Sequence, residues 1–253
     1  TIGIDGNGNT ITSSTALVAG SLNDAIFKII GGDRITISAF NMIEDPANTN
    51  NVAGTNNMTE FGVAVFYAST TDGAQFITII NNTIDLNRTY PNTFGIYATS
   101  QHSATSISVA AQATAPSGAH NNLRIYNNDI TDVNTGICVN GATTFATGLD
   151  IGSVTPITGN TISNFGTTVT GLSGYVGVSG TINGIQITNQ LNANVSYNFI
   201  TSSVGGVTTT ATLRGIYYRQ SAAPTSGSWS STLINNSISL RHGAAGGAVL
   251  GIA

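Results

Sequence analysis

The hydrophobic and polar positions of this chain follow a short pattern that recurs from one end to the other. In ITIINNTIDLN (77–87), two adjacent asparagines interrupt an apolar segment, and an isoleucine follows two residues after the second. Seven copies of this asparagine, any residue, isoleucine pattern are aligned along the chain, with their asparagines at Asn9, Asn41, Asn82, Asn128, Asn160, Asn198 and Asn236. The residue three places before the asparagine is aliphatic in the last five copies: Ile79, Ile125, Ile157, Val195 and Leu233.

A second pattern, glycine followed by an aliphatic residue, lies between the asparagines. It reads FGVAV (61–65), FGIYA (94–98), TGICV (135–139), NGIQI (183–187), RGIYY (214–218) and LGIA (250–253). Alternation with period 2 is typical of a strand with one face toward a core. We expect an outward row made of Ala64, Tyr97, Cys138, Gln186 and Tyr217, with Tyr218 pointing inward.

Strands of constant pattern separated by spacers of variable length predict a solenoid, because each coil must meet its neighbour while loops are free to grow outward. A helical solenoid is excluded, since no segment keeps a 3.6-residue period and Thr, Ile, Val, Asn and Gly are weak helix formers. An antiparallel sandwich would not explain why the same motif recurs with the same flanks.

Stacked coils also explain the asparagines. Equivalent residues of successive coils lie about 4.8 Å apart, so identical side-chain amides can bond to one another in a ladder. We expect this structural ladder at Asn82, Asn128, Asn160, Asn198 and Asn236. The first two copies differ, because Gly6 and Ser38 stand where the others have an aliphatic residue.

On these two motifs the sequence resembles a right-handed parallel β-helix of the pectin-lyase-like superfamily. The resemblance covers essentially the whole chain and implies an all-β fold: a right-handed parallel β-helix solenoid of about six to seven coils with long irregular loops, one domain over residues 1–253. It does not specify an activity, because the superfamily includes lyases, hydrolases, tailspikes and non-catalytic surface proteins. The composition resembles repeat regions of large secreted bacterial surface proteins, which implies an extracellular or cell-surface location.

Charge is scarce, at 7% of residues against about 25% in an ordinary globular protein. Lys28 is the single lysine and the net charge is −4, so no basic stripe exists for a nucleic acid. No apolar run approaches the roughly 20 residues of a membrane helix, so we expect no membrane insertion. The chain opens on TIGIDG and ends on VLGIA, and we expect a segment of a longer protein.

The candidate chemistry is sparse. Asp129 and Asp132 flank one asparagine turn, and with Asp85 of the preceding copy they predict an acidic patch suited to Ca²⁺; we expect no other cofactor. Cys138 is alone and is interpreted as a small apolar residue. The three histidines, His102, His120 and His242, are interpreted as polar loop residues.

Aromatic residues supply a second candidate site. Tyr97 and Tyr217 on the outward row, with the only tryptophan, Trp229, in a nearby loop, are candidates for stacking on sugar rings. The long loops at 98–122, 166–181 and 221–231 are where recognition would vary on a rigid scaffold.

Three functional hypotheses follow. The first is a non-catalytic structural or adhesive segment of a surface or matrix protein, which associates with itself or with further coils of the same chain. The second is a carbohydrate-active enzyme (a polysaccharide lyase or glycoside hydrolase) or its inactive relative. The third is a glycan-binding module with a polysaccharide partner. Because acid–base catalysis needs two placed titrating groups and this chain has few, the first hypothesis is favoured.

Overall fold

The computed structural model describes residues 1–14, 24–51, 57–103, 113–152, 155–166, 181–203, 212–220, 230–243 and 247–253. Their regular structure is β-strand, apart from two 3₁₀ turns, η1 (Pro116–Gly118) and η2 (Pro156–Thr158). The all-β expectation is therefore confirmed.

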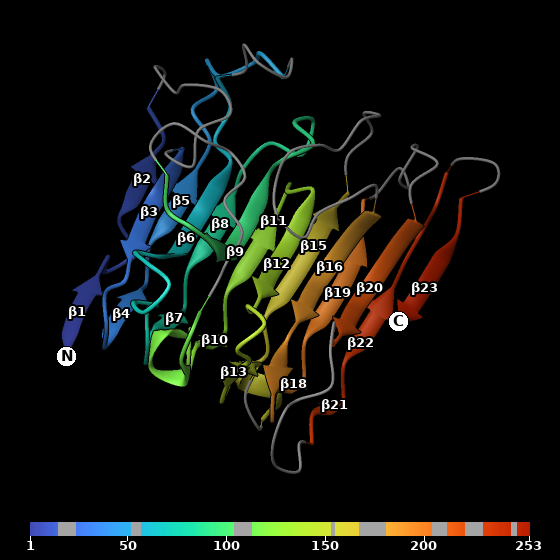
Figure 1. Cartoon of the computed structure of the whole chain (residues 1–253). Helices are drawn as coiled ribbons and strands as arrows, with labels where there is room; N and C mark the ends of the chain where they lie inside the picture. The colour runs from blue at the N-terminus through green and yellow to red at the C-terminus, as the bar shows by residue number, and fades with distance from the viewer. Residues whose placement is uncertain are drawn as a thin grey trace.

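Three parallel sheets of seven strands each make up the fold (Figure 1). Sheet A contains β1 (Ile2–Asp5), β4 (Ile35–Ser38), β7 (Thr78–Ile80), β10 (Arg124–Tyr126), β14 (Asp150–Ile151), β18 (Asn194–Ser196) and β21 (Thr232–Ile234). Sheet B contains β2 (Thr10–Thr12), β5 (Asn41–Ile43), β8 (Thr83–Asp85), β11 (Asp129–Thr131), β15 (Thr161–Phe165), β19 (Phe199–Ser202) and β22 (Ser237–Ser239). Sheet C contains β3 (Ala25–Ile30), β6 (Phe61–Tyr67), β9 (Phe94–Gln101), β12 (Thr135–Asn140), β16 (Thr181–Thr188), β20 (Thr212–Arg219) and β23 (Val249–Ile252). A small two-stranded sheet pairs β13 (Ala146–Thr147) with β17 (Gln190–Leu191).

The chain visits sheets A, B and C in turn and then starts again, so each strand pairs with the strand of the same sheet one visit later. We call one such visit a coil; β1 to β3 form the first coil and β21 to β23 the last. In Figure 1 the coils lie side by side, and the two termini are at opposite ends of the stack. This arrangement is compatible with the predicted parallel β-helix.

The two sequence motifs meet in the core. The isoleucines of the asparagine motif form a column in sheet B, in which Ile84, Ile130, Ile162, Ile200 and Ile238 stack in register. In five of the six copies of the second motif, the glycine faces an isoleucine of this column; Gly251, in the last coil, has no atom within 4 Å of an added Cβ. A Cβ on Gly136 would lie 2.6 Å from Ile162 Cγ2 and 2.5 Å from the Gly184 carbonyl oxygen. Glycine is therefore required here for close packing between sheets B and C.

Two details of the predicted register are wrong. In the second copy the structure aligns Met42, not Ile43, with Ile84, so Phe40 rather than Asn41 occupies the ladder position. In the fifth coil Ile151 takes the place assigned to Ile157, which lies in η2 and is 82% exposed. In the second coil the turn has the same length as in the third, and phenylalanine stands at the ladder position with the asparagine one residue later. In the fifth coil, residues are added to the turn between sheets A and B.

Candidate functional site

The asparagine ladder is confirmed at all five predicted positions. The side-chain amide of each asparagine donates to the amide oxygen of the next, at distances of 2.9 to 3.0 Å, through Asn82, Asn128, Asn160, Asn198 and Asn236. The same oxygens also accept the backbone N–H of the preceding asparagine at 3.0 to 3.1 Å. A buried unpaired amide would cost about 1–3 kcal/mol, and this arrangement avoids that cost.

The ladder is interrupted toward the first coil. Asn82 Oδ1 accepts the backbone N–H of Phe40 at 3.1 Å, and the phenyl ring supplies no amide to continue the ladder. In the first coil Thr10 pairs with Asn41, so the preceding residue, Asn9, lies beside Phe40. Asn9 therefore occupies the ladder position of the first coil. Its side-chain amide binds the Gly6 carbonyl, and among the described residues its Oδ1 accepts no hydrogen bond.

The outer face of sheet C carries the predicted outward row. Ala64, Tyr97, Cys138, Gln186 and Tyr217 are in register, and Tyr218 packs inward against the main core. The row begins in an aromatic cluster, where ring centroids lie 4.7 to 5.7 Å apart between Phe61, Phe94 and Tyr97. Tyr97 is fully buried and hydrogen-bonds Ser100 Oγ at 2.9 Å, so the expectation of an exposed ring there is wrong.

Cys138 lies beside this cluster and is fully buried, as expected of a small apolar residue. Burial raises the pKa of its thiol to about 12. Burial also raises the pKa of Tyr97 well above its usual range. Neither group therefore ionises near neutral pH, and this part of the face is a packed aromatic layer.

Further along, the outer face becomes polar. Asn183 donates to Gln186 Oε1 at 2.8 Å, and Gln186 donates to Asn140 Oδ1 at 3.2 Å. Three buried atoms at one position of consecutive strands have no hydrogen-bond partner among the described residues: Thr135 Oγ1, Asn183 Oδ1 and Arg214 Nε. These atoms form a row parallel to the stack axis, and sequence periodicity alone did not identify it.

Tyr217, in contrast to Tyr97, is partly exposed. The Arg214 guanidinium lies over its ring, 4.4 Å from the centroid. Trp229, the third predicted glycan contact, lies outside the described residues. The predicted aromatic site thus reduces to Tyr217 and Arg214 on β20.

The three predicted calcium ligands do not form a metal site. Asp129 is exposed opposite Thr83, whereas Asp85 lies opposite Thr131. Asp132 instead pairs with Arg88, at 3.2 Å from Nε, and accepts Asn164 at 2.6 Å. Burial, and then the charges of Asp132 and Asp129, raise the pKa of Asp85. Within the described ranges, no group of three or more His, Cys, Asp or Glu side chains could hold a metal ion.

The sequence did not predict that two buried acidic residues, Asp24 and Glu60, lie in neighbouring coils, because they are far apart along the chain. Asp24 and Glu60 each precede a strand of sheet C, and the Glu60 N–H donates to the Asp24 carbonyl at 3.1 Å. Tyr90 donates its hydroxyl to Glu60 Oε1 at 3.2 Å. Burial, followed by the charge of Glu60, raises the pKa of Tyr90. The sequence signal was the shared position of the two acids immediately before the strand.

His120 is not the polar loop residue that the sequence suggested. It is fully buried, its ring lies 3.7 Å from that of Tyr67, and Nδ1 accepts the Ala74 N–H at 2.9 Å. Burial lowers the pKa of His120 to about 3 and raises that of Tyr67 to about 12. Both side chains are therefore neutral at physiological pH.

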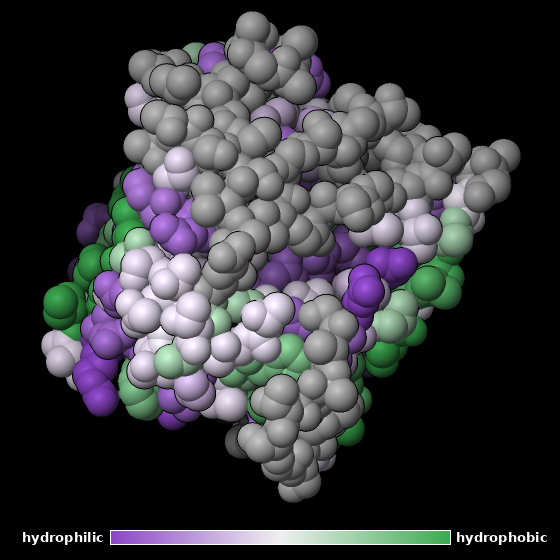
Figure 2. Space-filling model, in the orientation of Figure 1, coloured by the Kyte–Doolittle hydropathy of each residue, from purple (hydrophilic) through white to green (hydrophobic). Residues whose placement is uncertain are grey.

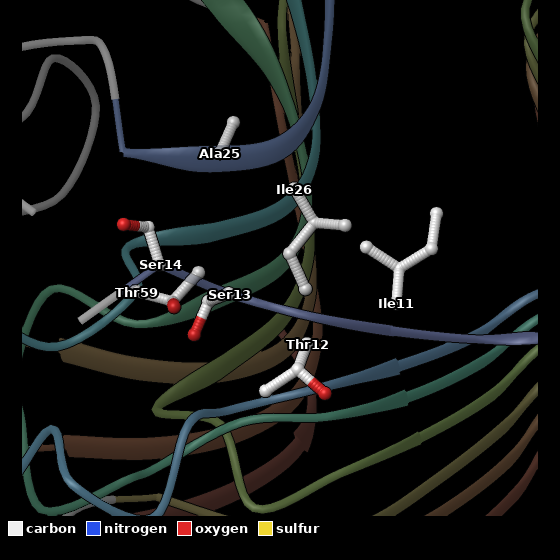
Figure 3. A pocket seen from close by; sticks show the side chains of 7 residues that line it. All are labelled: Ile11, Thr12, Ser13, Ser14, Ala25, Ile26 and Thr59. Atoms are coloured by element: carbon white, nitrogen blue, oxygen red, sulfur yellow. The ribbon is translucent and has the colours of Figure 1, made fainter. Parts of the chain in front are cut away.

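A pocket of about 160 Å³ lies in the first coil (Figure 3). Ile11 and Thr12 of β2 and Ala25 and Ile26 of β3 line it, together with Ser13, Ser14 and Thr59. Nearby, the Glu44 carboxylate accepts Ser13 Oγ at 2.8 Å, Asn48 Nδ2 at 2.8 Å and both the N–H and hydroxyl of Thr59. These bonds hold the polar rim together and leave an apolar recess at the end of the core.

Comparisons with protein-family models, with curated proteins and with solved structures each return no match. Among the described residues, no helix is long and apolar enough to cross a membrane. The residues and their contacts therefore carry the functional argument.

Proposed function

We propose that this chain is a right-handed parallel β-helix of seven coils, of the pectin-lyase-like kind, that serves as a non-catalytic structural or adhesive segment of an extracellular or cell-surface protein. The handedness follows from the strong preference of parallel strand connections for the right-handed form. The low charge and the Thr-, Asn- and Gly-rich composition support a secreted surface protein.

The observation that carries this proposal is the continuous asparagine ladder. Its amides are bonded to the coils on either side, from Asn82 to Asn236. The isoleucine column and the glycines that face it run parallel to the ladder. The asparagine ladder, the isoleucine column and the glycines that face it each join one coil to the next. We expect the resulting stack to be a rigid rod.

The test is a screen of the purified chain against acidic and neutral polysaccharides, read out as new reducing ends and as absorbance of unsaturated products. We expect no turnover under any condition, including added Ca²⁺. Reproducible turnover that is lost in Glu60→Gln, but kept in the Asp85→Asn control, would refute the non-catalytic assignment. Glu60 is fully buried just before β6 of sheet C, next to Asp24 of the preceding coil, whereas Asp85 is half-buried on β8 of sheet B.

A second candidate function, glycan binding on the outer face of sheet C, is favoured by one observation. Arg214 stacks on the partly exposed Tyr217 at the end of the row of unpartnered polar atoms, and this is a suitable place for a sugar ring with a carboxylate. A glycan array would test it. The control is Tyr197, a partly exposed tyrosine that follows β18 of sheet A. Binding that disappears in Tyr217→Ala and persists in Tyr197→Ala supports this function, and an array with no signal rejects it.

A further inference from the structure

We propose that Asn87, in the turn between β8 and β9, is the acceptor of an N-linked oligosaccharide that is transferred from a lipid diphosphate carrier. This inference rests on the proposed function, because such glycans are attached to secreted and surface proteins. The pattern that the transferring enzymes recognise is a sequon, namely asparagine, any residue except proline, then serine or threonine. The chain contains five sequons, at Asn57, Asn81, Asn87, Asn194 and Asn235.

Asn87 begins a tight turn that brings its side chain to the threonine of its own sequon. Asn87 Oδ1 accepts the Thr89 hydroxyl at 2.7 Å and the Thr89 N–H at 3.1 Å. The Asn87 carbonyl accepts the Tyr90 N–H at 3.2 Å and the Thr93 hydroxyl at 3.0 Å, and these two bonds close the turn. This is the Asx turn, in which asparagine binds the backbone two residues further on. The two residues that a transferase must recognise are therefore already in contact.

The amide nitrogen of the partly exposed Asn87 is available for reaction. Within the described chain Nδ2 donates no hydrogen bond, and it is not one of the buried atoms without a partner, so it reaches solvent. In the transfer, Nδ2 forms a bond to C1 of the first sugar while the bond between C1 and the diphosphate oxygen breaks. The diphosphate leaves with the electron pair, and one amide proton passes to a base of the transferase. The two hydrogen bonds to Oδ1 stabilise the charge that the amide gains as this proton leaves.

Two of the other sequons have their reacting groups bound elsewhere. The Thr59 hydroxyl donates to Glu44 at 2.9 Å, so it is not directed to Asn57. Asn194 Nδ2 donates to Asp150 Oδ1 at 2.7 Å, in the strand of the neighbouring coil. In both cases the contact that holds the fold competes with the contact that the transferase needs.

Asn81 and Asn235 are the closest comparison, because both are exposed. Each takes a left-handed backbone conformation, with φ of 60° and 56°, and each is followed by a strand of sheet B that contains the sequon Thr83 or Ser237. Within the described chain no hydrogen bond joins either asparagine to that hydroxyl. These two sequons therefore match Asn87 in sequence and exposure but lack the Asx turn.

An acidic residue adds a second feature that only Asn87 has. Asp85 lies two residues before it, on the outer face of β8, because the intervening neighbour Ile84 points into the core. Transferases of the bacterial type require an acidic residue at this position, whereas those of the eukaryotic type require only the sequon. At the other four sequons this position holds Thr55, Ile79, Asn192 and Leu233.

An oligosaccharide also suits the low charge of this protein, in which 7% of residues are charged. Figure 2 shows pale, weakly polar surface and apolar surface over much of the described chain, with strongly hydrophilic residues gathered in smaller areas. An attached glycan is bulky and strongly hydrated. At the turn after β8 it adds solvation without replacing any residue of the asparagine ladder or the isoleucine column.

The experiment incubates the folded 253-residue chain with a purified bacterial-type oligosaccharyltransferase and a lipid diphosphate-linked oligosaccharide. Intact mass counts the glycans, and fragmentation of glycopeptides locates them. We expect one glycan, at Asn87. A short peptide with an acidic residue two places before its sequon shows that the enzyme is active. A folded chain that stays unmodified while this peptide is modified overturns the proposal.

A single-subunit transferase of the eukaryotic type tests the turn, because it does not need the acid. With this enzyme only the Asx turn distinguishes Asn87 from Asn81 and Asn235 in the folded chain. We expect Asn87 to be modified first. Equal modification of the three sites would show that the turn does not select Asn87, and would overturn the assignment.

Three variants separate the roles of the residues. Asn87→Gln should abolish the modification, and Asp85→Asn should abolish it only with the bacterial-type enzyme. Thr89→Val should lower the initial rate about ten-fold or more, through the loss of one hydrogen bond, whereas the control Thr89→Ser should retain the modification. Unchanged melting temperatures would show that all variants fold. An unmodified Asn87 leaves the structural role intact, since that role fails only if polysaccharide turnover is found.

Discussion

At the scale of single residues, one contact explains why glycine and isoleucine recur together. The glycine of sheet C is needed because the isoleucine of the next coil occupies the position of its missing Cβ. None of Gly62, Gly95, Gly136, Gly184 and Gly215 has a positive φ, so space rather than backbone conformation requires the glycine. The glycine motif of sheet C therefore reflects close packing, which a glycine-to-alanine substitution can test.

Gly136→Ala should lower the free energy of unfolding by about 1–3 kcal/mol, because the added methyl must displace a backbone carbonyl and a buried isoleucine. Urea denaturation monitored by circular dichroism measures the change. Gly251→Ala, in the same column but with open space around the Cβ, is the control and should leave dilute-chain stability within about 0.5 kcal/mol of the parent. Equal stability of the two variants would contradict the packing argument.

The central amide of the ladder provides a second residue-scale prediction. Asn128→Ala removes the acceptor of two donors from Asn82 and leaves the Ile79 carbonyl without its amide partner. We expect a loss of roughly 1–3 kcal/mol in the free energy of unfolding. Asn9→Ala is the matched control, since the exposed Asn9 side chain bonds only to Gly6. A loss in Asn9→Ala as large as that in Asn128→Ala would show that the bonds between coils are not the cause.

At the scale of elements, the repeat predicted which strands stack but not how the turns between them are filled. The outward row of sheet C was predicted correctly from period 2, whereas the burial of Tyr97 was not. The burial of Tyr97 depends on the rings of Phe61 and Phe94, which lie beside the Tyr97 ring. Likewise Arg88, which follows β8, forms an ion pair with Asp132, one of the three expected calcium ligands. Such contacts between turns are set by packing, and sequence spacing does not encode them.

His120 gives a prediction at this scale, because it joins the segment before β10 to β6 through Tyr67. Its pKa in the fold is about 3, below the ordinary 6.5, so the unfolded chain binds a proton first. The stabilisation is complete above about pH 6.5 and is lost as pH falls toward 3. With about 1.4 kcal/mol per pH unit, this group alone should reduce the free energy of unfolding by about 2 kcal/mol between pH 7 and pH 5.

Denaturant unfolding at several pH values measures this slope. His120→Asn should flatten it, because the asparagine can still accept the Ala74 N–H but does not titrate. The pKa of Tyr67, raised to about 12, keeps that neighbour neutral throughout the range. An unchanged slope in His120→Asn would mean that His120 does not remain neutral in the folded protein.

At the scale of the whole molecule, the strands of each coil pair only with those of the neighbouring coils, so stability should follow position in the stack. The strands of the central coils are buried on the core side, with Ile84, Ile130 and Ile162 fully inaccessible. The strands β1 and β23 are exposed along their whole length. Local opening should therefore begin at the two ends and spread inward.

Hydrogen exchange read by mass spectrometry tests this order. In the dilute chain, amides of β8, β11 and β12 should exchange slowly, while those of β1, β21 and β23 exchange fast. Uniform exchange along the stack would contradict the dependence of stability on position in the stack.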